Sequence, residues 1–422
     1  MDKLYRKIRE EVSEIPLIDI HTHLNPKRLR AEDLSEIILY HYIATELVTS
    51  GMPREILNIS DPDERVKRSL PFLNRVRNTS TFWALEKIVS KLFGFSGVLT
   101  EGNFNLLKEK FLDFEKNFNG IVFLKDKVGV KKSFLTLQFT DLNSSFNTLF
   151  TGSLRLEKLS KDFSKDSLEK LEELSSIEIK NAEGLREGLR WVFEKFEKQI
   201  SSIAISLNPS ENVGTYNKGT VDDTIMKVRS GYQLNEGDKN QLISFTIREF
   251  LNLIRDRDIV FQLMLGVERP VIGASPPDYA IVVNDPKQLL SLCQIFYEYR
   301  DVKFDVISAS RIQNHELNVI AKNYSNVFVS GFWWYSYYPS IISEKTIERL
   351  QMLPMSKWCA FFSDAYVPEW CFGKAELIRH QLSLTLSNLV DQGYFTIDLA
   401  LEVARRILYE NPIEIYGLKV FD

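Results

Sequence analysis

The sequence predicts an α/β protein of the (β/α)8 barrel class, TIM-type, with a helical insertion after the first strand. Two observations support this prediction: eight short apolar runs have the density of buried strands, and amphipathic helical patterns lie between most of them. In addition, no Gly-x-Gly-x-x-Gly follows any of the runs, which disfavours a dinucleotide-binding sheet. Near-continuous apolar runs are typical of strands buried on both faces.

The eight predicted strands are rich in β-branched and aromatic residues, and they comprise residues 17–23, 120–124, 133–139, 203–207, 259–265, 302–308, 327–332 and 359–362. Helical periodicity predicts helices between and after them, over residues 182–198, 238–255, 286–299, 314–323, 344–352, 371–391 and 396–410. The gap between the second and third runs is short for a crossover helix, which is the weakest point of the strand count.

The segment between the first two runs has no strand signal. Amphipathic patterns over residues 30–50, 62–67, 81–93 and 105–118 are separated by Gly, Pro and Ser, so they predict a helical cap over about residues 25–118. We expect this cap to belong to one barrel domain that spans residues 1–422. A later stretch, residues 208–237, is rich in Gly, Asn, Ser and Thr and predicts a mobile loop near the site.

The composition narrows the function classes. Lys and Arg number 53 against 57 Asp and Glu, for a formal net charge of −4, so no basic excess favours nucleic acid or an anionic membrane. The apolar run at residues 259–267 is about half as long as a membrane span. The charged start shows no signal peptide, and three scattered cysteines are too few for a disulfide framework. We therefore expect a cytoplasmic protein.

The first predicted strand ends in two histidines, His21 and His23. On a strand their side chains point the same way, with Cα atoms about 6.5 Å apart, and two imidazoles at that spacing can share one metal ion. The carboxyl ends of barrel strands are also where such folds keep their chemistry. The alternative is a strand whose two histidines are simply satisfied by hydrogen bonds.

Asp364 directly follows the eighth predicted strand and is the best third ligand, although a helix N-cap would explain the same residue. Two neutral imidazoles and a carboxylate suit a divalent metal, with zinc the first expectation and manganese the second. The ends of the fifth and sixth runs carry no histidine, and the fourth ends in no lysine. A binuclear hydrolase site therefore lacks ligands.

Four short strings together give a resemblance to a known family. They are Asp-Ile-His-Thr-His-Leu at residues 19–24, Tyr-His-Tyr at 40–42, Gly-Phe-Trp-Trp at 331–334 and Ser-Asp-Ala at 363–365. In this order the sequence resembles a divergent member of the uronate (glucuronate) isomerases, within the amidohydrolase superfamily. The resemblance extends along the whole barrel and is dense at its mouth.

The resemblance implies aldose–ketose isomerisation of a hexuronate, D-glucuronate to D-fructuronate or D-galacturonate to D-tagaturonate. It implies one metal held by His21, His23 and Asp364. It also places Tyr42, with His41 beside it, where a proton is moved between C1 and C2, and Asp364 as a further catalytic group. Tyr42 and His41 equally suit ordinary helix packing.

The same resemblance implies that Trp333 and Trp334 form a wall against the sugar, because aromatic faces suit its C–H bonds; both also suit ordinary core packing. Two departures stand out. The family usually has an arginine at the position of Tyr366 and another in the third-strand region, which the strand count assigns to Gln138. A phenol and an amide replace a guanidinium poorly as carboxylate ligands.

Arg269 and Arg311 follow the fifth and sixth predicted strands and could replace the missing arginines in binding the substrate carboxylate. Two alternatives therefore stay open: a mononuclear metal-dependent hydrolase or isomerase of another sugar, and a catalytically silent carbohydrate-binding barrel. The expected partner is a small sugar acid rather than nucleic acid or a membrane, and a homo-oligomer is left open.

Overall fold

A computed structural model describes residues 2–142 and 146–420 of the chain. Its main sheet has eight strands, and a two-stranded hairpin forms a second sheet. The eight strands are β1 (Leu17–Thr22), β2 (Val130–Leu137), β3 (Phe150–Arg155), β4 (Ile200–Ser206), β5 (Val260–Leu265), β8 (Phe304–Ser308), β9 (Val327–Ser330) and β10 (Trp358–Cys359). The hairpin consists of β6 (Val267–Glu268) and β7 (Ile281–Val282).

The strands of the main sheet follow one another in chain order, and each pairs in parallel with the next. The segment after β10 returns to β1 through two main-chain hydrogen bonds, from Asp364 N to His21 O at 3.0 Å and from His23 N to Ala365 O at 2.9 Å. These bonds close the ring of strands at their carboxyl ends. The prediction of a (β/α)8-type barrel is confirmed.

One predicted strand is wrong and one strand is missed. Residues 120–124 form a helical turn, α7 (Gly120–Val122), which continues into the π-helical η4 (Phe123–Val128). The Asn119 side chain accepts hydrogen bonds from the N–H groups of Ile121 and Val122, so it caps a helix where apolar density alone indicated a strand. The missed strand is β3, whose Gly and Ser dilute the apolar signal although all six of its residues are buried.

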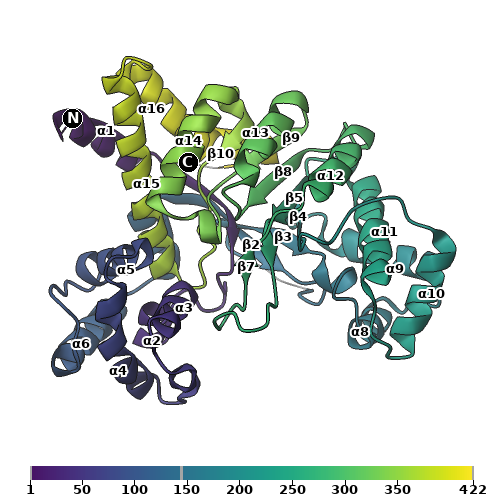
Figure 1. The fold of residues 1–422 in the computed structure, drawn as a ribbon, viewed down its shortest axis with the longest axis horizontal. Coiled ribbons are helices and arrows are strands. Elements are labelled where there is room, and N and C mark those ends of the chain that lie inside the picture. The colour runs from purple at the N-terminus through teal and green to yellow at the C-terminus, as the bar shows by residue number, and fades with distance from the viewer. Residues whose placement is uncertain (1, 143–145, 421–422) are drawn as a thin grey trace.

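Helices surround the barrel in three groups (Figure 1). Helices α2–α6 lie on one side of the strands and α8–α11 on the opposite side, with α12–α16 between them. The elements outside the cap segment are α1 (Asp2–Glu14), η5 (Glu157–Leu159), α8 (Lys165–Ser175), α9 (Ala182–Phe196), α10 (Lys218–Arg229), α11 (Glu236–Ile254), α12 (Pro286–Glu298), α13 (Gln313–Asn323), η6 (Trp334–Ser336), α14 (Pro339–Met352), η7 (Met355–Lys357), α15 (Pro368–Asp391), α16 (Ile397–Arg405), η8 (Arg406–Glu410) and α17 (Asn411–Tyr416). Among the described residues, no helix is long and apolar enough to cross a membrane.

The segment between β1 and β2 is helical, as its patterns indicate. It comprises α2 (Leu34–Ile38), α3 (His41–Thr49), η1 (Arg54–Asn58), α4 (Pro62–Leu73), η2 (Asn74–Val76), α5 (Ser80–Lys91), η3 (Glu101–Asn103), α6 (Phe104–Glu115), α7 and η4. The single helix expected over residues 30–50 is instead broken at Tyr40, whose φ of −49° and ψ of 140° are not helical. The break starts a new helix at His41 and turns its first residues toward the barrel.

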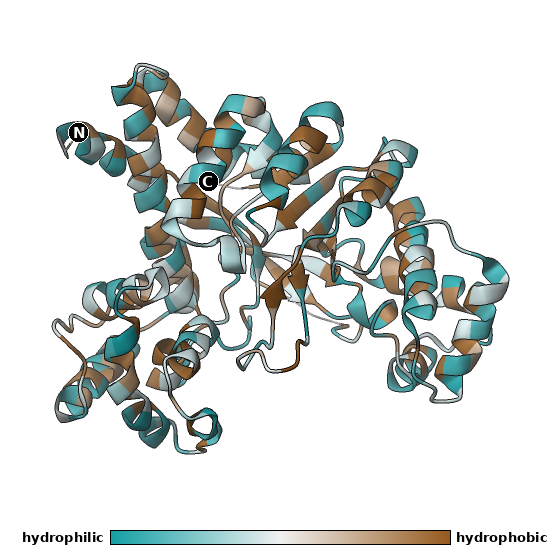
Figure 2. Ribbon diagram, viewed as in Figure 1, coloured by the Kyte–Doolittle hydropathy of each residue, from teal (hydrophilic) through white to brown (hydrophobic). Residues whose placement is uncertain are grey.

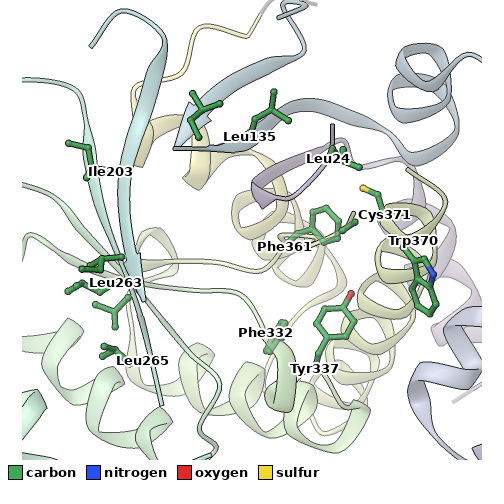
Figure 3. Close-up of a cluster of buried hydrophobic side chains, with 14 of the residues drawn as sticks. Leu24, Leu135, Ile203, Leu263, Leu265, Phe332, Tyr337, Phe361, Trp370 and Cys371 are labelled. Carbon is green, nitrogen blue, oxygen red and sulfur yellow. The ribbon is translucent and has the colours of Figure 1, made fainter. Parts of the chain in front are cut away.

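Apolar side chains fill the barrel and the layer between strands and helices. The strands are mostly apolar, while the helices alternate apolar and polar faces (Figure 2). The close-up in Figure 3 shows Leu135, Ile203 and Leu263 from strands of the barrel, Tyr337 from the segment between η6 and α14, and Trp370 from the start of α15. Trp370 is 1% exposed and donates from its indole N–H to Ile37 O at 3.0 Å, which ties α15 to the cap helices.

Candidate active site

The site forms where the end of β1 meets the segment after β10. Besides the two main-chain bonds that join these segments, the buried Asp19 carboxylate accepts a hydrogen bond from Ser363 N at 2.7 Å. Asp364 itself has a φ of 50°, in the left-handed region that residues other than glycine rarely adopt. The backbone around Asp364 is thus held in a strained conformation that aims its side chain at β1.

His21, His23 and Asp364 form one cluster whose potential ligand atoms lie within 4.8 Å of one another. The Nε2 atoms of His21 and His23 lie 3.5 Å and 3.3 Å from the Oδ1 atom of Asp364. The two imidazole rings meet edge to face, with centroids 5.1 Å apart. The predicted metal ligands therefore come together as expected.

The protonation states of the cluster fit a metal. Burial lowers the pKa of His21 well below its ordinary value, and the neighbouring His23 lowers it further, so the ring is neutral and its lone pair is available. Burial alone would raise the pKa of the Asp364 carboxyl, but the hydrogen bond from His23 and the charge of Lys374 outweigh it and hold the pKa well below its usual range. Two imidazoles and an ionised carboxylate are a donor set suited to a divalent cation.

Tyr42 and His41 lie beside this cluster at the start of α3. The Tyr42 hydroxyl donates to Asp364 Oδ2 at 2.9 Å, and burial raises the pKa of this phenol well above its ordinary value. The ring of His41 lies 4.1 Å from that of Tyr42 between centroids. Its Nδ1 atom is 3.0 Å from the carboxylate of Asp278, in the loop of the β6–β7 hairpin, while Nε2 is buried without a hydrogen-bond partner among the described residues.

Aromatic rings line the mouth around Tyr42. Trp334 is 7% exposed and lies nearly parallel to the Tyr42 ring, with centroids 6.4 Å apart, and Trp333 packs against Trp334. Tyr366 stacks on His23 at 4.7 Å with an angle of 8° between the rings. The guanidinium of Arg269 lies 5.3 Å from the Trp334 ring centre. The structure therefore brings these four sequence-predicted residues to the same region.

The carboxyl end of β3 supplies a cation that the sequence analysis missed. Because the strand count was shifted, Gln138 was assigned to the third strand, whereas the true third strand ends in Arg155. Arg155 is 8% exposed, pairs with Glu157 through Nε and Nη2, and places Nη1 3.2 Å from Met264 Sδ. Its positive charge helps to lower the pKa of His21, so it faces the same mouth.

The Arg155–Glu157 pair is stable as a unit. Burial alone would raise the pKa of Glu157, but the charge of Arg155 and its hydrogen bonds outweigh this and lower the pKa. Glu157 also accepts a hydrogen bond from Ser206 N at 2.9 Å, which fixes the pair against the end of β4. Arg155 therefore presents a preorganised guanidinium at the mouth.

Two sequence-predicted residues are not brought to the cluster by any contact among the described residues. Gln138 follows β2, is half-buried and uses its backbone N–H to donate to Asp141 at 2.7 Å. Arg311 is exposed and forms an ion pair with Glu344 on α14, at 2.7 Å between Nη2 and Oε2. Neither residue therefore lies where it could bind a substrate carboxylate next to His21, His23 and Asp364.

A second missed cation is Lys374 on α15, which is 3% exposed. Burial lowers the pKa of Lys374 to about 8, with the charge of Asp364 opposing the shift. The sequence does contain a signal for it, because Lys374 stands at helical spacing from Trp370, Leu377 and Ile378 on an otherwise apolar face. A charged residue in such a stripe marks a buried charge.

Comparison with known proteins now bears on this geometry. No protein-family model matches the chain. A uronate isomerase of Clostridium perfringens (strain 13 / Type A) is 22% identical over 451 residues, covering 96% of this chain and 94% of that protein. Among solved structures, uronate isomerase of Thermotoga maritima superposes with a TM-score of 0.89 at 17% identity, covering 98% of this chain and 97% of that one.

The chain has the fold of the uronate isomerases. Glucuronate isomerase of Caulobacter crescentus gives a TM-score of 0.86 at 15% identity and covers 100% of this chain and 95% of that one. A uronate isomerase of Bacillus halodurans gives 0.81 at 21% identity, over 99% and 97% of the two chains. The resemblance to uronate isomerases that the four motifs indicate is therefore confirmed along the length of the chain.

Proposed function

We infer that this protein is a uronate isomerase, which interconverts an aldose acid and its ketose at a single metal site. The observation that carries the inference is the cluster of His21, His23 and Asp364, with the Tyr42 hydroxyl hydrogen-bonded to Asp364 at 2.9 Å. The named relatives, which align over nearly the whole chain, support the substrate class.

A divalent metal held by His21, His23 and Asp364 would supply Lewis acidity toward the sugar oxygens next to the carbonyl. The protein's own contribution is to hold the ligands in place. The backbone bonds between β1 and the segment after β10 fix Asp364 against His21, and Thr136 Oγ1 lies 3.3 Å from His23 Nδ1, which orients that ring.

Tyr42 and His41 are the proposed groups for moving the proton between C1 and C2. The raised pKa of Tyr42 keeps its hydroxyl protonated at neutral pH, so it serves as a donor to a sugar oxygen. The carboxylate of Asp278 holds His41 through Nδ1, which leaves Nε2 able to accept a proton. An acid and a base thus lie on adjacent residues of α3.

We assign the substrate carboxylate to the Arg155 side of the mouth. Arg155 is buried and held by Glu157. Burial raises the pKa of Tyr366, and the charges of Arg269 and Arg155 both oppose this shift, so both guanidinium groups lie near the Tyr366 phenol. The guanidinium at the end of β3 can bind the substrate carboxylate, which the phenol of Tyr366 and the amide of Gln138 would bind poorly. Trp334, which carries the Arg269 guanidinium on its face, offers an aromatic surface to the sugar.

The test is a substrate panel with purified protein and added zinc or manganese. D-glucuronate and D-galacturonate are each compared with the neutral sugars D-glucose and D-galactose, and ketose formation is followed by NMR. We expect turnover of at least one uronate and none of the neutral sugars. Turnover of a neutral sugar alone would instead support an isomerase of another sugar, the alternative that the exposed Tyr366 phenol favours.

Finer assignments belong to the same proposal. Zinc is the metal we expect first, because two imidazoles and one carboxylate suit it, with manganese second. A cytoplasmic location and a homo-oligomer remain expectations. A catalytically silent barrel would bind metal weakly or not at all and would turn over no sugar in the panel.

A further inference from the structure

Lys374 has an unusual environment next to the proposed site. Its ammonium nitrogen lies over the faces of three tyrosine rings, 4.7 Å from the centre of Tyr42, 5.2 Å from Tyr40 and 5.6 Å from Tyr337. We call these four residues the Lys374 cage. A cavity of about 10 Å³ beside it has room for about one water molecule. The ammonium is therefore shielded from solvent.

The Lys374 ammonium lies in the cage without forming an ion pair. Among the described residues, no carboxylate lies within ion-pair distance of Lys374, and its Nζ donates a hydrogen bond to the backbone oxygen of Asp364, at 3.4 Å. A buried ammonium is costly to desolvate, and three aromatic faces offset only part of that cost. An apolar side chain would fill the same space more cheaply, so stability alone does not account for a lysine here.

What Lys374 touches points to its role. The Asp364 backbone oxygen accepts from both Lys374 Nζ and the Tyr40 hydroxyl, the latter at 2.9 Å. This is the residue whose φ of 50° is strained. Lys374 also lies against the face of Tyr42, whose hydroxyl donates to the Asp364 carboxylate. One ammonium thus contacts both members of the Tyr42–Asp364 hydrogen bond.

We propose that Lys374 is a positioning residue, which clamps the Asp364 backbone and the Tyr42 ring so that the Asp364 carboxylate faces His21 and His23. The proposal deepens the proposed function, since it concerns the same metal site. Its test is metal affinity, which does not depend on a uronate being the substrate. A residue of this kind acts through the ligand it orients rather than by touching the reacting atoms.

The experiment compares Lys374→Met with Lys345→Met in the full-length protein. Lys345 is a matched control because it is also buried, at 1% exposure, and donates to a strand-end carbonyl, Ser308 O, at 3.1 Å. Zinc dissociation constants are measured by competition with a chromophoric chelator. We expect Lys374→Met to weaken zinc binding by about 10- to 100-fold, and Lys345→Met to leave it within about twofold of wild type.

Tyr337→Leu provides a second variant if Lys374→Met does not fold. It removes one ring of the cage, together with the hydrogen bond from the Tyr337 hydroxyl to the Lys374 backbone oxygen, and leaves the side chains of Lys374, Tyr42 and Asp364 unchanged. We therefore expect a smaller loss of about threefold or more in zinc affinity. Wild-type zinc affinity in either folded variant would overturn the role of Lys374. A wild-type protein that binds neither zinc nor manganese would instead overturn the metal site itself, and these two failures are distinguishable.

Discussion

The two sides of the barrel mouth bury their charges in opposite ways. On the β1 side, the Asp364 carboxylate faces the imidazoles of His21 and His23, and within the described chain no lysine or arginine pairs with it. On the β3 side, the Arg155 guanidinium is already paired with Glu157. The first arrangement could hold a cation, as we propose, whereas the second already pairs opposite charges within the protein.

This difference sets the expected size of each perturbation. The buried carboxylate and its two imidazole neighbours form the proposed metal site, so a change there should remove the cation and the chemistry that it would supply. A preformed ion pair keeps its geometry with or without a substrate. A change there should weaken substrate binding only by the free energy of the hydrogen bonds that are lost.

Asp364→Asn is the largest expected loss. The amide keeps the side-chain volume but removes the anionic ligand, so we expect uronate turnover to fall by more than about 10³-fold together with the bound metal. Steady-state kinetics and metal analysis measure the two effects. His315→Ala is the matched control, because His315 is exposed on α13 and pairs with Glu348. Normal turnover and metal content in Asp364→Asn would contradict the ligand assignment.

Tyr42→Phe separates chemistry from metal binding. It removes the hydroxyl that donates to Asp364 and leaves the ring against Lys374. We expect kcat to fall by about 10²- to 10⁴-fold, the usual contribution of a positioned acid or base, while the metal content stays at one equivalent. A variant with full kcat would remove Tyr42 from the proton-transfer step.

Arg155→Met tests the other side of the mouth. A charge-assisted hydrogen bond contributes about 1.5 to 3 kcal/mol, so kcat/KM for a uronate should fall by roughly 10- to 100-fold with metal binding unchanged. The double variant Arg155→Met with Glu157→Gln is the control, because it avoids leaving a buried carboxylate unpaired. Unchanged kcat/KM in the folded double variant would place the substrate carboxylate elsewhere.

Asp305 gives the smallest expected effect on activity but a clear effect on stability. Burial raises the pKa of this carboxyl, on β8 inside the barrel, to about 6. The folded protein therefore keeps a proton that the unfolded chain loses near pH 4, so the free energy of unfolding should decrease by about 2 kcal/mol between pH 4 and pH 7. Urea unfolding at pH 4 and pH 7 measures this.

Asp305→Asn is the matched variant for that pH series. The amide cannot ionise, so the part of the pH dependence that Asp305 contributes should disappear. Neither side of the barrel mouth contains this residue, and uronate turnover should stay within about twofold of wild type. An undiminished pH dependence in the variant would show that another group titrates.

The cluster of His21, His23 and Asp364 was predictable from sequence. His21, His23 and Asp364 are unusual residues at the ends of apolar strands, and the barrel rule brings strand ends to one mouth. Tyr42 came from the resemblance, since its role depends on a break at Tyr40 that helical periodicity does not reveal. The barrel itself followed from eight runs, of which seven fall on or beside true strands.

The position of Arg155 at the end of β3 was not predictable in the same way. β3 contains Gly152 and Ser153, so its apolar density is low although its packing is complete. Residues 120–124 have that density but form a helix capped by Asn119. These two errors cancel in the number of strands, so the predicted third strand was in fact β2. As a result, Gln138 and not Arg155 was placed at the end of the third strand. A high density of apolar residues indicates that a segment is buried. Whether the segment forms a strand or a helix also depends on its local hydrogen bonds.

The most direct test removes all metal from the protein with a chelator, restores zinc or manganese stepwise, and assays D-glucuronate and D-galacturonate at each step. We expect no turnover in the metal-free protein and activity that rises to a plateau at about one metal per chain. Uronate turnover that is unaffected by metal removal, or the absence of any turnover with either metal, would contradict this expectation.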